Sequence, residues 1–232
     1  GIEALVRGIA DPIPPAIKTG FDVTSIKEKG GGYVISSDEE TISADHIIST
    51  IPLQSLLSCL EDVPQKVQAA CDALRYNSLC SVFIGIKGEV PGISWLYVPD
   101  EGTGLFNRIS FPSNYSTKVA PEGHASILAE ITYNDGDAVS QMSDTEVADQ
   151  TVRSLVTADI IPSLDAVVYT GVERQKFAYV VYDIEYKNNI RVVREFCSER
   201  DIDLVGRFSR FEYLNMDGCI RSAMDYVKVA KR

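Results

Sequence analysis

The segment best suited to chemistry runs from Gly206 to Asp225 and reads GRFSRFEYLNMDGCIRSAMD. A short apolar strand ends at Gly206, a loop follows, and Asn215 and Asp217 stand where a helix is expected to begin. A helix N-terminus presents unpaired N–H groups and the positive end of the helix dipole, so it attracts an anionic group such as a phosphate. Asn215 or Asp217 could equally be a plain N-cap of that helix.

Metal and triad chemistry find little support in the sequence. His46 and His124 are the only histidines, and neither has a cysteine or a second histidine at metal-ligand spacing. We therefore expect no metal site, and the sequence assigns no catalytic residue. His46 lies inside the strand-like ADHIIST and is expected to be structural. The cysteines form no CxxC pair and are expected to be reduced, buried thiols. They are Cys59, Cys71, Cys80, Cys197 and Cys219.

Composition excludes two classes of partner. The 232 residues are 45% hydrophobic and 24% charged, as in ordinary globular domains. The net charge of −11, from 22 basic and 33 acidic residues, offers no footprint for nucleic acid. No apolar run approaches the roughly 18 to 20 residues that span a bilayer, and the first residues do not form a signal peptide. These features predict a cytoplasmic protein without a transmembrane segment.

The first part of the chain predicts a small sheet beside helices. Residues 2–10 are apolar at helical spacing, and prolines stop them. Residues 21–29 and 33–37 alternate as strands around a run of three glycines, and a third short strand follows. ADHIISTIP, residues 44–52, is apolar on consecutive positions, as in a strand buried on both faces. Two helical stretches come next. A chain that starts on a helix, with no strand before it, suggests a truncated α/β domain.

From Ser78 onward the pattern becomes β-rich. SLCSVFIGIK, SWLYVP, LFNRISFPS and HASILAEITYN predict a largely antiparallel sheet, and AVVYTGVERQKFAYVVY returns to strand. Between them lies a helix that opens with Ser143. Glu146 stands three residues after Ser143, which is the signature of a capping box.

The last part of the chain returns to α/β character. YKNNIRVVREFCSERD predicts an amphipathic helix, IDLVGRF a short buried strand, and NMDGCIRSAMDYVKVAKR a closing helix. The composition shift predicts an outer domain of residues 1–57 and 187–232, with a central domain of residues 58–186 inserted in it. ADHIIST and IDLVG should then share one sheet, with the closing helix against it.

GRFxxxEYxNMD resembles the C-terminal flavin motif of FAD-dependent amine oxidoreductases, closest to the branch of UDP-galactopyranose mutase and protoporphyrinogen oxidase. Four other segments resemble this family in the same order: GIEALVRGIA, FDVTSIKEKGGGYVISSDEETISADHIISTIPLQSLL, WLYVPDEGTGLFNRISFPSNYS and KFAYVVYD. The likeness runs from Gly1 to about Asp225. It implies an α/β fold, α+β overall: the remainder of an FAD-binding Rossmann-like domain with an inserted, mostly antiparallel sheet-plus-helix substrate domain.

The resemblance implies a set of residues that contact the cofactor, FAD. Val23 would meet the adenine side through its backbone, and Gly206 and Arg207 would lie beside the flavin and its substrate. Backbone N–H groups at the start of the closing helix would meet the flavin edge or the ribityl chain. The implied cofactor residues are Val23, Gly206, Arg207, Asn215, Met216 and Asp217.

The same resemblance implies residues that hold a substrate diphosphate, as in the mutases. They are Tyr97, Arg108, Tyr179, Arg207 and Tyr213. Arginine suits this role because its planar fork binds phosphate oxygens in pairs, and tyrosine adds a neutral donor. The two arginines should then converge on one cleft. In the competing interpretation they are surface or salt-bridge arginines, and the tyrosines are core or rim aromatics.

The sequence departs from the family pattern at several points. No GxGxxG occurs in it, and the run Gly30–Gly32 joins two strands instead of opening a helix. Ser209 and Arg210 replace a glycine and an aromatic that the mutases usually carry, and Val180 replaces a proline. Without the glycine-rich turn that holds the pyrophosphate, this chain alone should bind FAD weakly or not at all.

Three functions remain open at this stage. The chain would be the C-terminal part of an FAD-dependent oxidoreductase or a flavin-dependent nucleotide-sugar mutase, inactive in isolation. The alternative parent is an amine or protoporphyrinogen-type oxidase. The likeness of SNYS, Arg108 and Tyr97 to the mutases slightly favours a sugar-nucleotide substrate over that alternative. An alternative of another class is a non-catalytic module that binds an anionic sugar or a protein. The expected partner in the first two cases is a small-molecule substrate, which in the mutase case is a nucleotide sugar.

Overall fold

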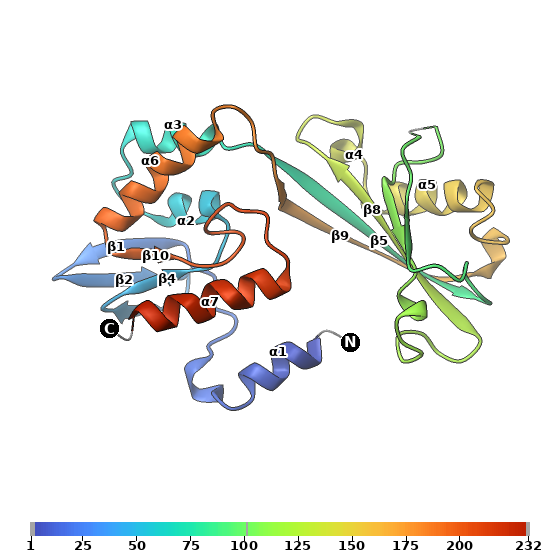
Figure 1. Cartoon of the computed structure of the whole chain (residues 1–232), viewed down its shortest axis with the longest axis horizontal. Helices are drawn as coiled ribbons and strands as arrows, with labels where there is room; N and C mark the ends of the chain where they lie inside the picture. Colours follow the sequence, from blue (N-terminus) through green and yellow to red (C-terminus); the bar gives the residue numbers. More distant parts are fainter. Residues whose placement is uncertain (1–2, 101, 231–232) are drawn as a thin grey trace. The chain divides into compact units, whose positions relative to one another are not determined.

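The computed structural model describes residues 3–100 and 102–230 (Figure 1). The chain divides into two compact units, which are described separately. The central unit comprises Gly1–Gly8 and Asn77–Ala178, and the outer unit comprises Ile9–Tyr76 and Tyr179–Arg232. The predicted first helix is present as α1 (Glu3–Ala10), and its first predicted residue, Ile2, lies outside the described residues. Among the described residues, no helix is long and apolar enough to cross a membrane.

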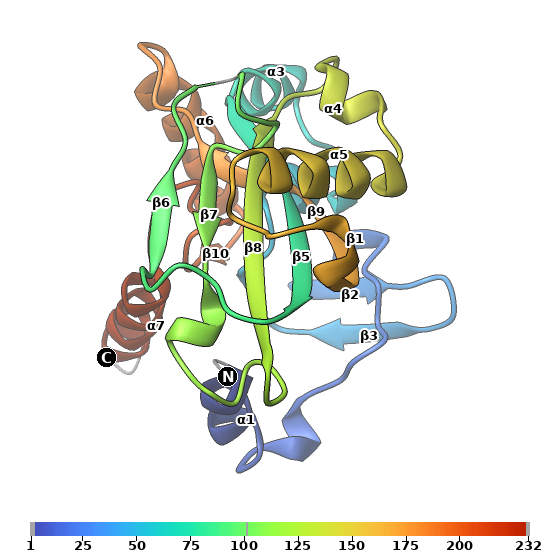
Figure 2. The same cartoon turned by 90° about the vertical axis from the view of Figure 1, so that its right-hand side faces the viewer.

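The central unit is built on one five-stranded sheet. Its strand order is β6-β7-β8-β5-β9, and the pairs β6–β7, β7–β8 and β8–β5 are antiparallel. The strands are β5 (Tyr76–Lys87), β6 (Trp95–Tyr97), β7 (Arg108–Ser110), β8 (His124–Tyr133) and β9 (Val167–Val180). The short helix α4 (Ala138–Gln141) and the longer α5 (Asp144–Thr157) follow β8, and Figure 2 shows α5 lying across the sheet. The predicted antiparallel sheet is confirmed.

One face of this sheet forms the core of the central unit. Alternate residues of β5, β7 and β8 are buried against α5, as period-2 patterning requires. Phe111 and Leu155 are among the side chains that are completely buried. The predicted capping box is confirmed as well: the Ser143 hydroxyl accepts from the Glu146 N–H, and the Glu146 carboxylate accepts from the Ser143 N–H at 2.8 Å.

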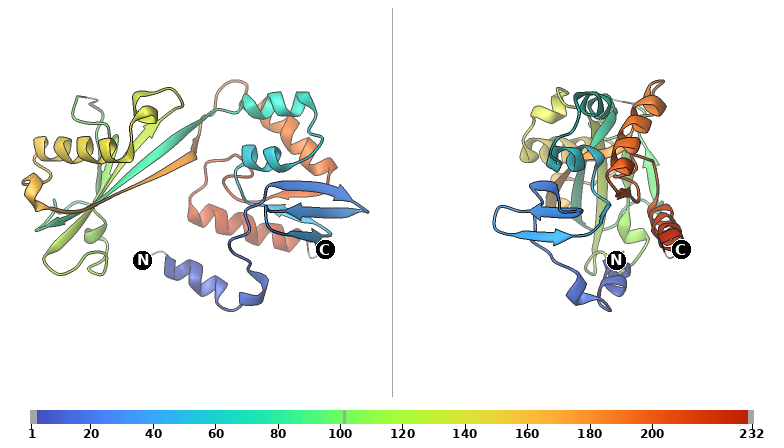
Figure 3. Two further views of the ribbon diagram at one scale, coloured as in Figure 1. Left: turned by 180° about the vertical axis from the view of Figure 1, so that it is seen from behind. Right: turned by 90° about the vertical axis from the view of Figure 1, so that its left-hand side faces the viewer.

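The outer unit begins with the predicted meander (Figure 3). Strands β1 (Ser25–Lys29), β2 (Gly32–Ser36) and β3 (Thr41–Ala44) pair in sequence order and antiparallel. Gly30 and Gly31 form the first turn with φ values of +65° and +83°. Glycine is favoured there because side chains strain this backbone conformation.

A second, two-stranded sheet lies beside the meander. Strand β4 (Ile47–Ser49) pairs parallel with β10 (Ile202–Leu204), so the prediction that these segments share one sheet is confirmed. The pair lies between α6 (Tyr186–Glu199) and α7 (Met216–Ala230), as Figures 1 and 3 show. The prediction that β4 is buried on both faces is wrong. Ile48, which points away from the α6 side, is 49% exposed, because α7 covers that face only in part.

The helices α2 (Leu53–Cys59) and α3 (Gln65–Asp72) complete the outer unit. They share one hydrophobic core with α6 and with the two small sheets. Residues 58–76 and 179–186 therefore lie in the outer unit, whereas the sequence pattern had predicted them in the central domain. Residues 3–8, predicted in the outer domain, belong to the central unit. The composition shift that begins at Ser78 coincides with the contact boundary at Asn77.

Candidate functional site

The loop between β10 and α7 is shaped by a glycine turn. Gly206 has φ +87°, and its N–H donates to the Ser222 hydroxyl of α7 at 3.1 Å. A Cβ atom at Gly206 would have no neighbour within 4 Å, so space does not require glycine there. The positive φ is the reason why glycine is favoured. The N–H of Glu212 donates to the Arg207 carbonyl at 3.0 Å and closes the loop on itself. The loop is thus tied to α7 and closed by its own backbone.

Arg207 is surrounded by aromatic rings. Its guanidinium carbon lies 4.6 Å from the ring centroid of Tyr213, 5.4 Å from that of Tyr179 and 5.8 Å from that of Phe208. The rings of Tyr179 and Tyr213 are stacked at 6.0 Å with an interplanar angle of 24°. Nη1 of Arg207 donates to the Leu214 carbonyl at 2.9 Å. Faces of aromatic rings attract a cation, so this cage helps to orient the guanidinium.

A second group of aromatic residues contacts the segment that carries Tyr213. The Tyr213 N–H donates to the Tyr182 hydroxyl at 2.7 Å, and Tyr182 meets Tyr186 edge to face at 4.7 Å. The Tyr186 hydroxyl in turn donates to the Phe211 carbonyl at 2.7 Å. Burial raises the pKa of Tyr186, so this donor stays protonated across the physiological range. Phe211 itself is buried and has φ +50°, a conformation that its surroundings must enforce.

The two family departures in this loop have local reasons. Ser209 is completely buried, and its hydroxyl donates to the Val205 carbonyl at 2.9 Å. Arg210 contributes to an ion-pair group: Glu212 Oε1 accepts from Arg194 at 2.6 Å and from Arg210 at 3.3 Å. Both residues therefore stabilise the loop that carries Gly206.

The helix predicted after this loop is confirmed as α7. Asn215, Met216 and Asp217 are exposed at its first turn, and the N–H of Cys219 donates to the Asn215 carbonyl at 2.9 Å. Asp217 places a negative charge at the positive end of the helix dipole. The arrangement suits an N-cap and an anion site alike.

Val23 lies in a different part of the outer unit, just before β1. Its side chain is half-buried and packs against the core of that unit. Its carbonyl accepts a hydrogen bond from the Cys59 thiol at 3.2 Å. The backbone of Val23 is therefore held in place by α2.

Tyr97 and Arg108 lie side by side in the central unit. They are direct partners in the β6–β7 register, and Glu130 of β8 is the next residue in the same row. Nη2 of Arg108 forms an ion pair with the Glu130 carboxylate at 2.5 Å, with the glutamate nearly buried. The row lies on the sheet face opposite α5, where Tyr97 is exposed. The predicted substrate residues thus fall into two groups, with Tyr179, Arg207 and Tyr213 in the outer unit.

Sequence reasoning missed several polar residues. Glu130 was visible as a lone charge in the apolar strand HASILAEITYN, but its partner 22 positions away was not. Among the described side chains, the Ser49 hydroxyl and both amide atoms of Gln54 are buried without a hydrogen-bond partner. Ser49 ends β4 and Gln54 opens α2, so both lie at the carboxyl end of the parallel strand pair. Open α/β sheets bind ligands outside the carboxyl ends of their strands.

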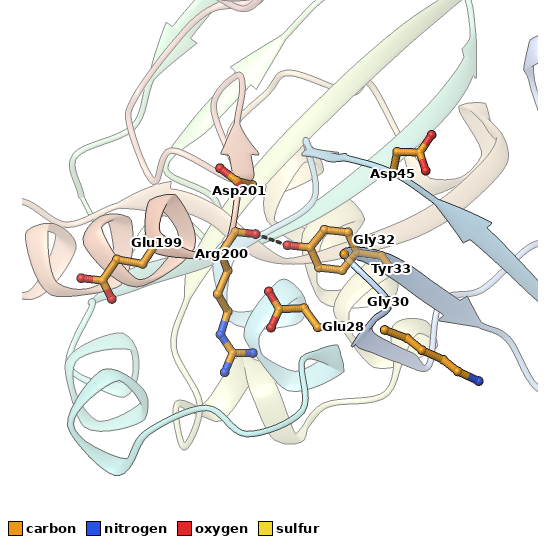
Figure 4. Close-up of a pocket in the computed structure, with 10 residues that line it drawn as sticks. Glu28, Gly30, Gly32, Tyr33, Asp45, Glu199, Arg200 and Asp201 are labelled. Carbon is orange, nitrogen blue, oxygen red and sulfur yellow. Dashed lines mark hydrogen bonds between the residues drawn. The ribbon is translucent and has the colours of Figure 1, made fainter.

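A cavity of about 370 Å³ lies beside the turn between β1 and β2 of the meander (Figure 4). Its lining comprises Glu28, Lys29, Gly30, Gly31, Gly32, Tyr33, Asp45, Glu199, Arg200 and Asp201. The Tyr33 hydroxyl donates to the Arg200 carbonyl, and the Arg200 side chain bonds the Glu61 carbonyl at 3.0 Å. The first bond joins the meander to the end of α6, and the second joins that end to the segment between α2 and α3. None of the predicted site residues lines this cavity.

Two other polar features are structural. His46 Nε2 lies 2.8 Å from the Asp203 carboxylate, which also accepts from the Tyr226 hydroxyl at 2.7 Å. This network fastens α7 to the strand pair, as expected for a structural histidine. No group of residues that could hold a metal ion occurs in the part of the chain that the structure describes.

Comparisons with solved structures show where this fold occurs. A reduced UDP-galactopyranose mutase superposes with a TM-score of 0.77 at 24% identity, covering 90% of this chain and 46% of that one. A putative protoporphyrinogen oxidase from Exiguobacterium sp. 255-15 gives 0.76 at 16% identity, covering 99% and 51%. A putrescine oxidase gives 0.67 at 12% identity, covering 100% and 53%. The chain spans about half the length of these proteins.

The comparison with protein families assigns the chain to a family. No curated protein matches the chain. The family described as flavin containing amine oxidoreductase matches residues 1–223, nearly the whole chain. The likeness carried by GRFxxxEYxNMD and the four segments before it is therefore confirmed. This chain belongs to the flavin containing amine oxidoreductase family.

Proposed function

We propose that this chain supplies the substrate domain and part of the flavin site of an FAD-dependent oxidoreductase or nucleotide-sugar mutase. The observation that carries the proposal is the cage around Arg207, which directly follows the Gly206 turn. An arginine held beside the stacked rings of Tyr179 and Tyr213 is preorganised for a diphosphate. It would bind at the same end of the outer unit at which a flavin is expected.

Residues of the outer unit fit a flavin nucleotide. The buried, unpartnered polar atoms of Ser49 and Gln54 lie at the carboxyl end of the parallel strands and suit a polar cofactor. Gly206 and the exposed first turn of α7 offer close backbone approach and N–H donors. Val23, Asn215, Met216 and Asp217 complete the proposed cofactor set. When bound, FAD supplies the redox chemistry of an oxidase or the attack on a sugar carbon of a mutase.

Arg108 and Tyr97 are the proposed contribution of the central unit to substrate binding. Glu130 holds the Arg108 side chain and balances its charge on the sheet. A guanidinium fork binds phosphate oxygens in pairs, which is the chemical reason for proposing this role for Arg108.

The mutase alternative is preferred to an amine or protoporphyrinogen-type oxidase because an arginine cage suits an anionic substrate better than an amine. The rival of another class, a binding module without redox chemistry, predicts a colourless protein. Flavin absorbance in the purified full-length protein separates the two. This chain alone should bind FAD weakly, since it contains no GxGxxG; sub-micromolar affinity in isothermal titration would contradict that expectation.

The experiment titrates UDP, a nucleoside diphosphate, into the flavin-loaded protein. Arg207→Ala and Arg108→Ala should each weaken binding by about tenfold to a hundredfold, the scale of losing charge-assisted hydrogen bonds. Arg207→Ala should also change the flavin spectrum, whereas Arg108→Ala should leave it intact. Arg191→Ala, an exposed arginine of α6 paired with Glu195, is the matched control and should change neither.

A double-mutant cycle tests whether Arg108 and Arg207 act on the same ligand. If both arginines hold the same diphosphate, the losses should be non-additive by about 0.5 kcal/mol or more. Additive losses would show that the two arginines act at separate places. UDP affinities that match the wild type in both single variants would remove the diphosphate site altogether.

A further inference from the structure

A row of side chains lies beside Arg108 on the exposed face of the central sheet. Trp95 of β6 is the register partner of Ser110 in β7. Leu128 of β8 follows Ser110 in the row, and Phe83 of β5 follows Leu128. These four strands are neighbours in the sheet, as Figure 2 shows. The row therefore crosses the sheet two residues away from Arg108, on the same face.

The aromatic side chains of this row point away from the core. Trp95 is 55% exposed and Phe83 is 44% exposed. The residues next to them along the strands, Leu96 and Ile84, pack in the core of the central unit. Side chains alternate between the two faces of a sheet, so Trp95 and Phe83 stand on the face opposite α5. Large apolar side chains that gather on one exposed face mark a binding surface, whereas isolated ones do not.

A third aromatic ring lies on the same face. A Cβ atom at Gly85 would come within 3.2 Å of the Tyr169 Cβ, and a Cβ atom at Gly171 within 2.6 Å of the Tyr169 hydroxyl. Glycine at both positions lets the ring of Tyr169, which is 60% exposed, lie along β9 against the sheet. Gly85 is two residues after Phe83 in β5, so Tyr169 extends the aromatic surface beyond the row.

The spacing of the rows suits a nucleotide. Rows two residues apart along a strand are separated by about 7 Å. A ribose separates the base of a nucleotide from its first phosphate by a comparable length. A phosphate on Arg108 would therefore place the base beside Trp95, over Ser110. Ser110 is half-buried there, and its hydroxyl can both donate to and accept from the edge of a base.

The chemistry of this face favours a base over an apolar chain as its occupant. A guanidinium and an exposed indole lie in adjacent rows, which matches a molecule that joins an anion to an aromatic ring. An alkyl chain over Ser110 would leave the hydroxyl without a partner, which costs free energy. The net charge of −11 does not support a nucleic-acid strand, so the ligand that fits is a single nucleotide.

We infer that Trp95 is a stacking platform for the base of a nucleoside diphosphate, with Ser110 at the edge of the base and Phe83 and Tyr169 bordering it. Every base has an aromatic face, so the platform would bind a base as such and not uracil in particular. Stacking of this kind contributes on the order of tenfold or more to affinity. The inference rests on the proposed function in one respect: Arg108 binds the diphosphate.

Substitutions at Trp95 test the stacking in the flavin-loaded protein. UDP, uridine and inorganic pyrophosphate are titrated separately by calorimetry. Trp95→Ala should weaken UDP binding by about tenfold or more and leave pyrophosphate binding within about twofold of wild type. Trp95→Phe keeps an aromatic face and should weaken UDP binding by about threefold or less. Leu164→Ala, which removes another exposed side chain of the central unit, is the matched control and should change neither affinity.

Fluorescence gives a readout that a mere loss of stability would not mimic. Trp95 is the only tryptophan of this chain, and the difference between wild type and Trp95→Phe isolates its emission. UDP and uridine should quench this emission, because a stacked base lies against the indole ring, whereas pyrophosphate should not. Unchanged emission, equal UDP affinity of wild type and Trp95→Ala, or equal losses of UDP and pyrophosphate affinity in Trp95→Ala would each overturn the inference.

The same titrations separate this inference from the proposed function. UDP binding that depends on Arg108 and Arg207 but not on Trp95 would retain the proposed function and remove the platform. Quenching of Trp95 by uridine, in a protein that contains no flavin and binds no pyrophosphate, would retain the platform and remove the proposed function.

Discussion

The two units build their hydrophobic cores from different elements. The central unit has long strands, such as the 12 residues of β5 and the 14 of β9, in one sheet whose inner face is sealed by α5. The outer unit has three-residue strands in β4 and β10 and draws its core from α2, α3 and α6. Function is proposed mainly for the second unit. The exposed loops of the outer unit are compatible with ligand binding, whereas the central unit, with its buried core, provides a scaffold.

The largest effect of a single substitution is expected in the core of the central unit. Phe111 is completely buried, so Phe111→Ala should destabilise this unit by about 3–5 kcal/mol through lost burial and an unfilled cavity. Trp95 is the only tryptophan and lies in β6, so its fluorescence in a denaturant titration reports on this unit. Phe208→Ala in the outer unit, at a ring 43% exposed, should cost about 1 kcal/mol or less. Equal destabilisation by the two variants would contradict the contrast.

Thiol labelling compares the accessibility of individual cysteines in the two units. Cys80 in the central unit and Cys71 and Cys197 in the outer core are buried, whereas Cys59 and Cys219 are only half-buried, contrary to the expectation that all five are buried. At pH 8, iodoacetamide should modify the buried three on the order of a hundredfold more slowly, because they react only after local opening. Mass spectrometry of timed samples measures this. Rapid modification of Cys80 would show that the central core opens readily.

The buried thiols also give a pH dependence. Burial raises the pKa of Cys71 to about 12 and that of Cys197 to about 11, and both thiols are neutral in the folded protein. Unfolded thiols ionise near their ordinary pKa of about 8.5, so the stabilising contribution is complete below that pH. It is lost as the pH rises through the folded pKa values. Melting temperatures of the outer unit should therefore fall between about pH 9 and pH 12.

The smallest expected effect concerns the N-terminus of α5. Ser143→Ala removes the capping box and should destabilise the central unit by about 1 kcal/mol. Ser163→Ala, at a short helix where the serine makes no capping bond, is the matched control and should be within about 0.5 kcal/mol of wild type. Hydrogen bonds from Ser143 lower the pKa of Glu146, so the difference should shrink as the pH falls through that lowered value.

Much of the central unit could be predicted because its signals are local. Alternation marks β5 and β8, and the spacing of Ser143 and Glu146 marks the start of α5. The meander was equally visible in its glycine turn. These features depend on neighbours in sequence, and the structure retains each of them.

The outer unit was harder to predict because its determinants are distant in sequence. The apolar run at β4 indicated burial on both faces, but Ile48 is exposed because only part of that face is covered. The cage around Arg207 depends on Tyr179, which lies in a strand end nearly thirty positions earlier along the chain. Motif resemblance named these residues, but only the fold shows which of them touch.

The pairing of β4 with β10 has a consequence for synthesis. His46, which directly precedes β4, and Asp203 of β10 are 157 residues apart. At translation rates of 5–20 residues per second, β4 waits about 8 to 30 s on the ribosome for its partner. The central unit ends at Ala178, so it is synthesised about 1 to 5 s before β10. Nascent chains should therefore hold a finished scaffold beside a half-made, apolar outer unit, which makes that interval the natural moment for chaperone binding.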